Sequence, residues 1–350
     1  MTHQVTVSPQ QVQEWADEEA LDAVGIVPVG PTPRWEAYRA WVAQGYAGGM
    51  SYLARADALA RRADPREILP AARSMLVVAA SYAGPSPPEL LPLHGRVSRY
   101  AGGYTGGMED YHRWLLRRLE ALVGRIRAAG GPFPYRCYVD TGPVMERAWA
   151  EAAGLGWIGK NTNLIHAHLG SFLFLGVALL GVELPPTPSS GLPDCGTCTR
   201  CIEACPTGAI VAPRVIDARR CLSYLTIEHR GPIPAEMRPL MGDRVFGCDV
   251  CQEVCPWNRR PLARYADAPP PAHATLALPP LLALDQAAFR ARFRATPIWR
   301  ATPDGLARNA AVVLGNLGDL AARPALERAA ASHPSAMVRE HAAWALARLS

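Results

Sequence analysis

Two cysteine runs decide the organisation of this chain: Cys195-Gly-Thr-Cys-Thr-Arg-Cys-Ile-Glu-Ala-Cys-Pro206 and Cys248-Asp-Val-Cys-Gln-Glu-Val-Cys-Pro256. The first run has the spacing of bacterial two-cluster ferredoxins. In that arrangement three close thiolates bind one iron–sulfur cluster, and the fourth, before proline, binds the other cluster. The pattern therefore predicts a protein that carries electrons through two [4Fe–4S] clusters.

The ligand sets follow from this crossed arrangement. The second run lacks one cysteine of the usual four, and Cys221 is the only spare thiol nearby that can complete a set. The first predicted cluster is bound by Cys195, Cys198, Cys201 and Cys255. The second is bound by Cys205, Cys221, Cys248 and Cys251. Zinc is the alternative, because C-x2-C pairs also build tetrahedral sites, whereas disulfides suit the tight spacing less well.

The chain shows no sign of export or of a membrane segment. The N-terminus, Met1-Thr2-His3-Gln4, has no basic segment followed by an apolar one and no twin arginine, so a cytoplasmic protein is expected. The most apolar run, residues 172–181, is far shorter than the ~18–20 residues that span a bilayer, and it predicts a buried strand. At 350 residues with 49% hydrophobic residues, the chain can form two or three domains.

The first 184 residues predict an α/β domain. The apolar runs at 74–80 and 135–139 are typical of strands, and residues 109–127 have the periodicity of an amphipathic helix. The second of these strands ends at Asp140, and a helix then leads into the glycine-rich loop 154–161. This edge is the predicted active site.

The C-terminal residues predict a small helical repeat domain. A Pro-rich linker at 185–191 precedes the cysteine-rich segment, and a second break at 268–272 follows it. Beyond that break, residues 308–314 and 339–346 echo each other at the spacing of a HEAT-type repeat. Residues 283–350 hold nine Arg against five Asp and Glu, which is +4 of the whole chain's +5. Such a module suits a polyanion, although a solvated basic surface is the alternative. The predicted domains are 1–184, 185–262 and 283–350.

The loop Gly154-x4-Gly159-Lys160 is not a nucleotide-binding loop. Asn161 replaces the Ser or Thr that would reach magnesium, and a helix precedes the loop instead of a strand. We expect its glycines to admit a large polar or flat ligand, with Lys160, Asn161 and Asn163 donating to its amides or carboxylates. Lys160 is the only lysine among the 36 basic residues. Either arginine cannot replace lysine at this position, or the lysine is there by chance.

Asp140 is the predicted general acid. A carboxyl group that delivers a proton near neutral pH needs a raised pKa, and burial beside an apolar cofactor would raise it. The alternative is an ordinary helix N-cap ahead of Pro143. Cys137 is the only cysteine outside the two ligand sets, and it is predicted to be a core residue.

Several long motifs together resemble the epoxyqueuosine reductase family. In chain order they span residues 140–143, 151–161, 170–171, 220–228 and 246–257, with the ferredoxin run between the third and fourth. The resemblance covers nearly the full length. It implies a cobalamin-dependent iron–sulfur enzyme that removes the epoxide oxygen of epoxyqueuosine at the tRNA wobble position, the last step of queuosine synthesis. It also implies an α/β cobalamin-binding domain related to reductive dehalogenases, a ferredoxin-like domain and a HEAT-like repeat domain.

The resemblance assigns site residues by position. Asp140 matches the family's proton donor, and the eight cysteines match its cluster ligands. The cofactor is expected to be base-off cobalamin, held near the backbone at Cys248 and by Arg62, Tyr100, Asp140, Lys160, Asn161, Asn163, Leu164, Ser171, Leu175 and Asp249. The loop 101–108 is longer than the family's usual connection. The chain therefore departs from the family's pattern next to Tyr100.

An electron path and two partners complete these expectations. A low-potential donor, ferredoxin or flavodoxin, is expected to reduce the first cluster, which passes electrons to the second and then to cobalt. The other partner is tRNA carrying epoxyqueuosine, with phosphates bound by Arg308 and Arg339. A monomer is expected. The alternatives are a reductive dehalogenase, a plain electron carrier, and a tRNA-binding module with structural metal.

Overall fold

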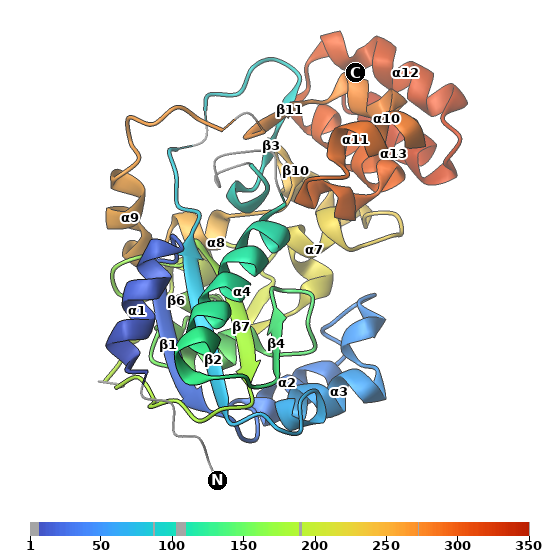
Figure 1. Cartoon of the computed structure of the whole chain (residues 1–350). Coiled ribbons are helices and arrows are strands. Elements are labelled where there is room, and N and C mark those ends of the chain that lie inside the picture. The colour runs from blue at the N-terminus through green and yellow to red at the C-terminus, as the bar shows by residue number, and fades with distance from the viewer. Residues whose placement is uncertain (1–6, 87, 103–109, 189–190, 272, 350) are drawn as a thin grey trace.

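The N-terminal part of the chain is built on a four-stranded antiparallel sheet (Figure 1). The computed structural model describes residues 7–86, 88–102, 110–188, 191–271 and 273–349. The strands lie in the order β1 (Ala23–Pro28), β2 (Ser74–Ser81), β7 (Leu173–Leu180) and β4 (Tyr135–Tyr138). The predicted strands at 74–80, 135–139 and 172–181 are therefore confirmed. Because every pairing is antiparallel, the fold is mixed α/β and contains no parallel crossover in this sheet.

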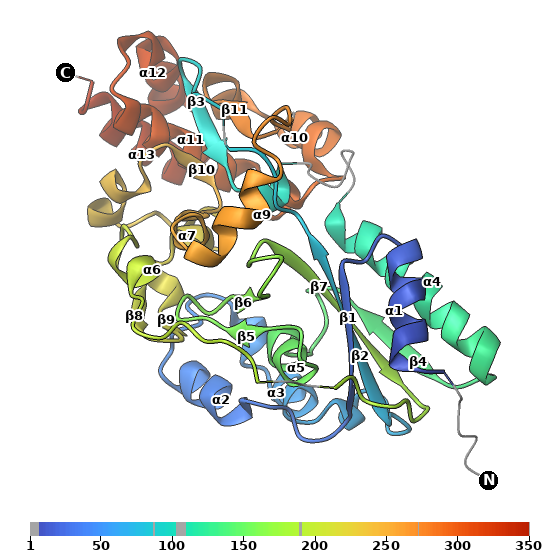
Figure 2. The same ribbon diagram turned by 90° about the vertical axis from the view of Figure 1, so that its left-hand side faces the viewer.

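Helices cover both faces of this sheet, because its strands alternate their apolar side chains. On β2, Leu76 and Val78 pack in the core under α1 (Pro9–Glu18) and α4 (Tyr111–Gly130). Met75 and Val77 face the opposite way, into the core under α5 (Glu146–Ala152). Figure 2 shows α1 and α4 side by side on one face of the sheet. The strand is thus buried on both sides and holds the site-bearing loops on a rigid support.

Short elements make up the rest of the molecule before the C-terminal helices. In the N-terminal part these are α2 (Trp35–Ala43), α3 (Ala56–Ala63), β5 (Trp157–Ile158) and β6 (Leu164–Ile165). In the cysteine-rich segment they are α6 (Arg200–Glu203), β8 (Ile210–Ala212), β9 (Val215–Ile216), α7 (Leu222–Ile227), α8 (Val250–Glu253) and α9 (Arg259–Ala263).

A second sheet joins the first two predicted domains to the segment that lies between the second and the third. Its strands are β10 (Arg244–Phe246), β3 (His94–Val97) and β11 (Thr275–Ala277), so each comes from a different part of the chain. Val97, Leu225 and Phe246 pack in one hydrophobic core with residues of the C-terminal helices. The cysteine-rich segment and the C-terminal helices therefore share a core across the predicted linker at 268–272.

Four α-helices of the described residues make up the C-terminal part of the chain. They are α10 (Gln286–Phe293), α11 (Pro303–Leu317), α12 (Arg323–Ser332) and α13 (Ala336–Leu346). Gly315 lets α11 approach α13 closely, since a Cβ there would lie 2.8 Å from the Ala345 Cα. Gly318, at φ +69°, ends α11 in the left-handed conformation. No helix in the described ranges is long and apolar enough to cross a membrane.

Candidate iron–sulfur and catalytic site

The first cysteine group comes together as the crossed ligand pattern predicts. Cys195, Cys198 and Cys201 line one cavity with Cys255, which arrives from the second run. Burial raises the pKa of the Cys201 thiol, and the charges of the other three thiols raise it further, because all four are close. Lys160 lies beside this group and donates from Nζ to the Gly196 carbonyl at 2.8 Å.

The second cysteine group lies beside the first. Burial raises the pKa of the Cys251 thiol well above its usual range, and the charges of Cys248 and Cys221 add to this effect. Burial also raises the pKa of the Cys221 thiol, and the charge of Cys205 raises it further. The Ala209 amide points at the Cys205 sulfur, 3.2 Å away, a contact that tunes the potential of an iron–sulfur cluster. The set of four thiols is the predicted one.

The zinc alternative and a four-iron cluster differ in how closely they draw their thiolates together. One zinc ion would draw four thiolates to about 2.3 Å from itself. A four-iron cube keeps its thiolates farther apart, because each binds a different iron.

Asp140 occupies a constrained turn directly after β4. Its φ is +57°, in the left-handed region that few residues other than glycine adopt, although Asp tolerates it better than most. Such outliers are kept where the surroundings enforce them, often at functional sites. The N-cap alternative is wrong, because α5 begins at Glu146 with Met145 as its cap. Cys137, on β4, packs partly buried against the sheet core, as predicted, and burial raises its pKa to about 12.

The first turn of α4 surrounds Asp140 with hydrogen-bonding groups. The Tyr111 hydroxyl donates to Asp140 Oδ2 at 2.8 Å, and His112 Nε2 lies 3.4 Å from the same oxygen. On its other side, His112 Nδ1 lies 2.5 Å from Asp110 Oδ1. The His112 ring stacks on Tyr111, which stacks on Phe174 of β7. An imidazole is thus held between two carboxylates.

These contacts reverse the expected acidity of Asp140. Burial raises its pKa, but the hydrogen bonds from His112 and Tyr111 and the charge of His112 outweigh burial, so the pKa is lowered. Burial lowers the pKa of His112, but the two carboxylates outweigh it and raise the pKa to about 9. The expectation of a raised pKa for Asp140 was therefore wrong. At neutral pH the proton of this pair resides on His112.

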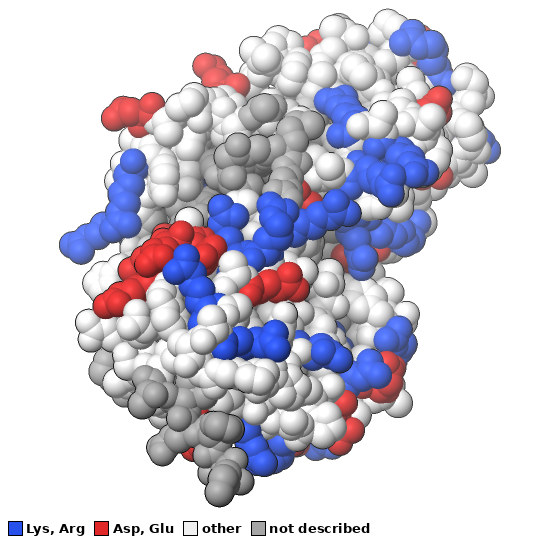
Figure 3. Space-filling model, in the orientation of Figure 1, with Lys and Arg blue, Asp and Glu red and all other residues white. Residues whose placement is uncertain are grey.

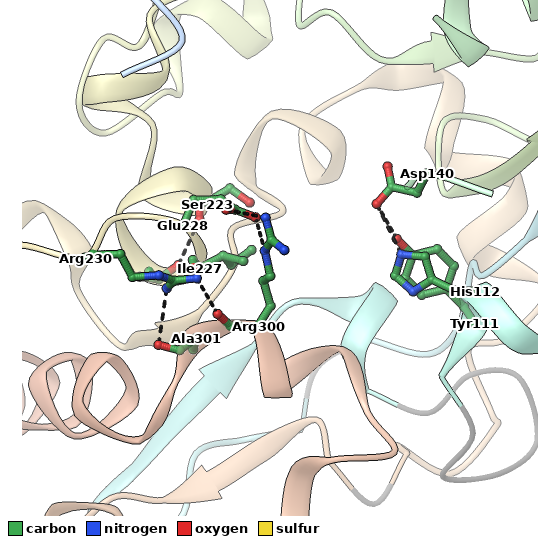
Figure 4. Close-up of polar contacts among 10 residues, drawn as sticks. Tyr111, His112, Asp140, Ser223, Ile227, Glu228, Arg230, Arg300 and Ala301 are labelled. Carbon is green, nitrogen blue, oxygen red and sulfur yellow. Dashed lines mark hydrogen bonds and ion pairs between the residues drawn. The ribbon is translucent and has the colours of Figure 1, made fainter. Parts of the chain in front are cut away.

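A second polar cluster, formed by Glu228, Arg230 and Arg300, is drawn together with Asp140 in Figure 4, and the Asp140 side chain is 66% exposed. Arg300 makes a two-pronged ion pair with Glu228, with Nε–Oε1 at 2.8 Å and Nη2–Oε2 at 3.0 Å. Arg230 donates to the Arg300 carbonyl at 2.7 Å. The Arg300 guanidinium also lies over the Tyr52 ring, 5.6 Å from its centroid. Burial raises the pKa of Tyr52, and the charges of Glu228, Arg300 and Asp140 all act on this hydroxyl, so the two clusters are neighbours.

The predicted cofactor contacts near the second cysteine group are brought together. Tyr100 packs its ring against Tyr111 and against Phe246, just before Cys248. Asp249 is buried and accepts from the Arg99 amide at 2.7 Å. Gly247, at φ +72°, allows this approach, because a Cβ there would lie 2.0 Å from the Ser98 Oγ. These contacts connect Asp140 to the second cysteine group through packed rings.

The other predicted contacts divide into two sets. Leu164 and Leu175 pack in or against the core under α5, and Ser171 Oγ is hydrogen-bonded to Gln252. Asn161 Nδ2 donates to the Cys251 carbonyl at 3.2 Å, and Asn163 Nδ2 lies 4.0 Å from the Cys251 sulfur. The donors expected to serve a ligand are thus directed at the cysteine groups, as is Lys160. The altered loop 101–108 lies largely outside the described residues.

Two ionisable side chains with buried polar atoms border the site. Arg62 on α3 is buried, with its guanidinium 5.8 Å from the centroid of the Tyr38 ring. Glu146 Oε1 is buried and has no hydrogen-bond partner in the described structure. Burial, followed by the charge of Asp140, raises the pKa of Glu146 to about 8, so this carboxyl group is neutral at pH 7.

The prediction that Arg308 binds tRNA is wrong. Arg308 is fully buried on α11 and donates to the backbone carbonyls of Leu225 at 2.6 Å, Gly231 at 2.6 Å and His229 at 2.9 Å. These bonds fasten α11 to the segment after α7, and no nitrogen is left for a phosphate. Arg339 is half-buried and donates to the His333 carbonyl at 2.6 Å, so its role toward tRNA stays a prediction.

Arg308→Ala is expected to destabilise the protein by about 3–5 kcal/mol, because it opens a cavity and leaves three carbonyls unpaired. The midpoint of chemical denaturation measures this effect. Arg328→Ala is the matched control, since Arg328 is exposed on α12 and should change stability by no more than about 0.5 kcal/mol. Equal midpoints for the two variants would contradict the structural role of Arg308.

Sequence reasoning missed the residues that set the charge of the site. The periodicity of residues 109–127 predicts only an amphipathic helix, and it assigns no chemical role to Asp110, Tyr111 or His112. The available signal was the run of three titratable residues, Asp110-Tyr111-His112, at the start of a helix. Nothing in the local pattern pairs Glu228 with Arg300, which is 72 residues away.

Comparisons with known proteins agree with this arrangement. The family model described as "4Fe-4S double cluster binding domain" matches residues 194–258, which include all eight cysteines. The model described as "Epoxyqueuosine reductase QueG, DUF1730" matches residues 62–141, which include Asp140.

Relatives that match over nearly the full length of the chain are also epoxyqueuosine reductases. An epoxyqueuosine reductase of Pseudomonas aeruginosa is 40% identical over 348 residues, covering 97% of this chain and 94% of the relative. That of Escherichia coli (strain K12) is 40% identical and covers 97% and 89%. The solved structure of the enzyme from Streptococcus thermophilus has a TM-score of 0.86 at 28% identity, covering 97% and 90%. A structure of an epoxyqueuosine reductase with an epoxyqueuosine-modified tRNA stem loop has a TM-score of 0.85 at 30% identity, covering 97% and 89%.

Proposed function

The chain belongs to the epoxyqueuosine reductase family and reduces epoxyqueuosine in tRNA to queuosine, and from this premise we propose which of its residues carry the reaction. The observation that carries the proposal is the exposed carboxyl group of Asp140, which accepts from Tyr111, whose ring packs on Tyr100 next to the second cysteine group. The predicted division into 1–184, 185–262 and 283–350 then separates proton delivery, electron supply and tRNA binding.

Electrons enter through the first cluster. Gly196, Thr197 and Arg200, around its ligands, are exposed, so a low-potential donor such as ferredoxin or flavodoxin can approach there. The cysteines of the second group are half-buried, and burial raises the pKa of Cys251 well above its usual range. The loop carrying Lys160 and Asn161 contacts both groups, which supports transfer from the first cluster to the second.

Cobalamin is proposed to bind between Asp140 and the second cluster. This region carries the rings of Tyr100 and Tyr111, and the unpartnered oxygen of Glu146 suits a corrin amide donor. The residues proposed to hold the corrin are Arg62, Tyr100, Asn163, Leu164, Ser171, Leu175 and Asp249. When bound, a reduced corrin supplies the reducing power for cleavage of a carbon–oxygen bond.

Asp140 delivers a proton to the departing epoxide oxygen. The overall reaction consumes two electrons and two protons, and it yields the cyclopentene of queuosine and water. Asp140 is suited to this role because 66% of its side chain is exposed and Tyr111 fixes its position.

The tRNA lies on the face between α4 and the C-terminal helices. Figure 3 shows a band of basic side chains across this face. Arg300 is 53% exposed, and Figure 4 shows it in the same region as Asp140, so a phosphate of the anticodon loop can reach it. A related enzyme has been solved with an epoxyqueuosine-modified tRNA stem loop, which supports a substrate of this class.

Arg300→Gln should weaken binding of the tRNA stem loop and reduce the salt slope of log Kd by about 1, because one phosphate contact is lost. Fluorescence anisotropy at several salt concentrations measures both quantities. Arg339→Gln tests the remaining predicted contact in the same assay, and the exposed Arg136→Gln on β4 is the control. An unchanged slope for Arg300→Gln would move the tRNA surface elsewhere.

The function is tested by conversion of the substrate. The cluster-loaded, cobalamin-loaded and reduced protein is incubated with tRNA carrying epoxyqueuosine, and the digested nucleosides are weighed by mass spectrometry. A nucleoside lighter by one oxygen, formed only with cobalamin, is the expected product. No conversion by fully loaded protein would redirect the proposal to reductive chemistry on a small molecule.

A further inference from the structure

We propose that His112 is the proton reservoir of this site, that it passes protons from solvent through Asp140 to the departing epoxide oxygen, and that Asp110 positions it. This inference rests on the proposed function, since the final proton acceptor is the oxygen of the substrate. It assigns His112 and Asp110 a part in the reaction besides their place at the start of α4.

The geometry of His112 is that of a group poised between two acceptors. Nδ1 faces Asp110 Oδ1 at 2.5 Å, and Nε2 faces Asp140 Oδ2 at 3.4 Å. A neutral imidazole can donate from only one nitrogen, whereas an imidazolium donates from both. Stacking on Tyr111, with ring centroids 4.0 Å apart, keeps the imidazole in this plane. The site is therefore built around the protonated ring.

The charged groups around His112 also favour its protonated form. The negative charges of Asp110 and Asp140 raise the pKa of His112 to about 9 against the effect of burial. Arg113 acts on Asp110, and Arg147 acts on Asp140; each helps to keep its carboxylate ionised. The pKa of the Tyr111 hydroxyl is raised by burial and by Asp140, so it stays protonated. The transferable proton is thus the one on His112 Nε2.

The relay accounts for both protons of the reaction. The epoxide carbon–oxygen bonds break, a carbon–carbon double bond forms, and oxygen leaves as water. The low-potential donor provides the two electrons through the clusters. Asp140 transfers each proton to oxygen after receiving it from His112 Nε2, and His112 regains a proton from solvent, to which 28% of its side chain is exposed. The 3.4 Å contact is expected to shorten when substrate binds.

Asp110 and Tyr111 are positioning residues in this relay. Asp110 orients the imidazole through Nδ1 and also accepts from the His112 backbone amide at 3.0 Å as the N-cap of α4. Asn is an equally good N-cap. Asp110→Asn therefore keeps the helix end and removes only the negative charge that supports the imidazolium.

The charge of His112 can be measured without turnover. Diethyl pyrocarbonate acylates an imidazole only when it is unprotonated, so the rate of His112 modification against pH, read by peptide mass spectrometry, gives its pKa. In the cluster-loaded full-length protein the midpoint is expected near 9, and Asp110→Asn should lower it. A midpoint near the ordinary 6.5 in the unaltered protein would overturn the relay, whatever the catalytic activity.

Turnover supplies the second readout. Because the acid form of His112 is required, the single-turnover rate should fall as pH rises through about 9. His112→Gln should lower the rate at neutral pH roughly 10²-fold and remove this limb, with tRNA affinity and both clusters retained. Tyr111→Phe should keep the limb, because it removes no titrating group in this range. A basic limb that His112→Gln leaves in place would overturn the relay even if queuosine is formed normally, whereas absent turnover with a midpoint near 9 would count against the proposed function instead.

Discussion

Asp140→Asn lowers the conversion of epoxyqueuosine to queuosine roughly 10²- to 10⁴-fold, the usual range for loss of a general acid. The reason is chemical and not structural. Asn has the same shape as Asp and also tolerates the left-handed backbone at this turn, where φ is +57°. Its amide can still contact Tyr111, but it cannot carry a proton from His112 to the substrate.

The measurement is the single-turnover rate of the loaded, reduced enzyme, with queuosine read by mass spectrometry. Iron content and the cobalamin spectrum should match those of the unaltered protein, which shows that only the proton transfer has been lost. Thr141→Ser, at the exposed neighbouring position, is the control and should leave the rate unchanged. Normal turnover by Asp140→Asn would show that another group protonates the oxygen.

The strands and the cysteine groups could be predicted because their signals are local. The runs at 74–80 and 172–181 consist of apolar residues that fill both sides of a central strand, so no distant partner is needed to recognise them. The crossed cysteine pattern likewise fixes which thiols meet, because the spacing within each run leaves few ways to surround a cube.

The acidity of Asp140 could not be predicted from the sequence, because its sign depends on a tertiary contact. Burial alone raises the pKa of a carboxyl group, which was the expectation. The first turn of α4, 28 residues earlier, brings His112 to within 3.4 Å and reverses that effect. The proton needed for catalysis is therefore stored on a residue to which the sequence pattern gave no role.

Arg308 shows the same limit for surface charge. On a helix, an arginine is usually solvated, so a basic C-terminal segment predicted a tRNA contact. The structure buries α11 on nearly all sides, and the guanidinium serves the carbonyls of a segment about 80 residues away. The net charge showed that this region is basic, but it did not identify which arginines are free to bind a polyanion.

Cys255→Ser should abolish queuosine formation and should damage the first cluster, although Cys255 belongs to the second run. The crossed arrangement places its thiol in the cavity with Cys195, Cys198 and Cys201, so its loss leaves that cluster with three ligands. Electrons from the donor then have no entry, and the conversion rate should fall to the background of the assay. Iron content should drop from about eight to between about four and seven per chain.

The decisive comparison is between spectra. Electron paramagnetic resonance of reduced Cys255→Ser should match that of Cys201→Ser, since both change the first cluster, and Cys205→Ser should instead match Cys251→Ser. Cys137→Ser, outside both groups, is the control and should keep both signals. If Cys255→Ser matched Cys251→Ser, each run would bind its own cluster, and the order of electron transfer inferred from the exposed first group would have to be abandoned.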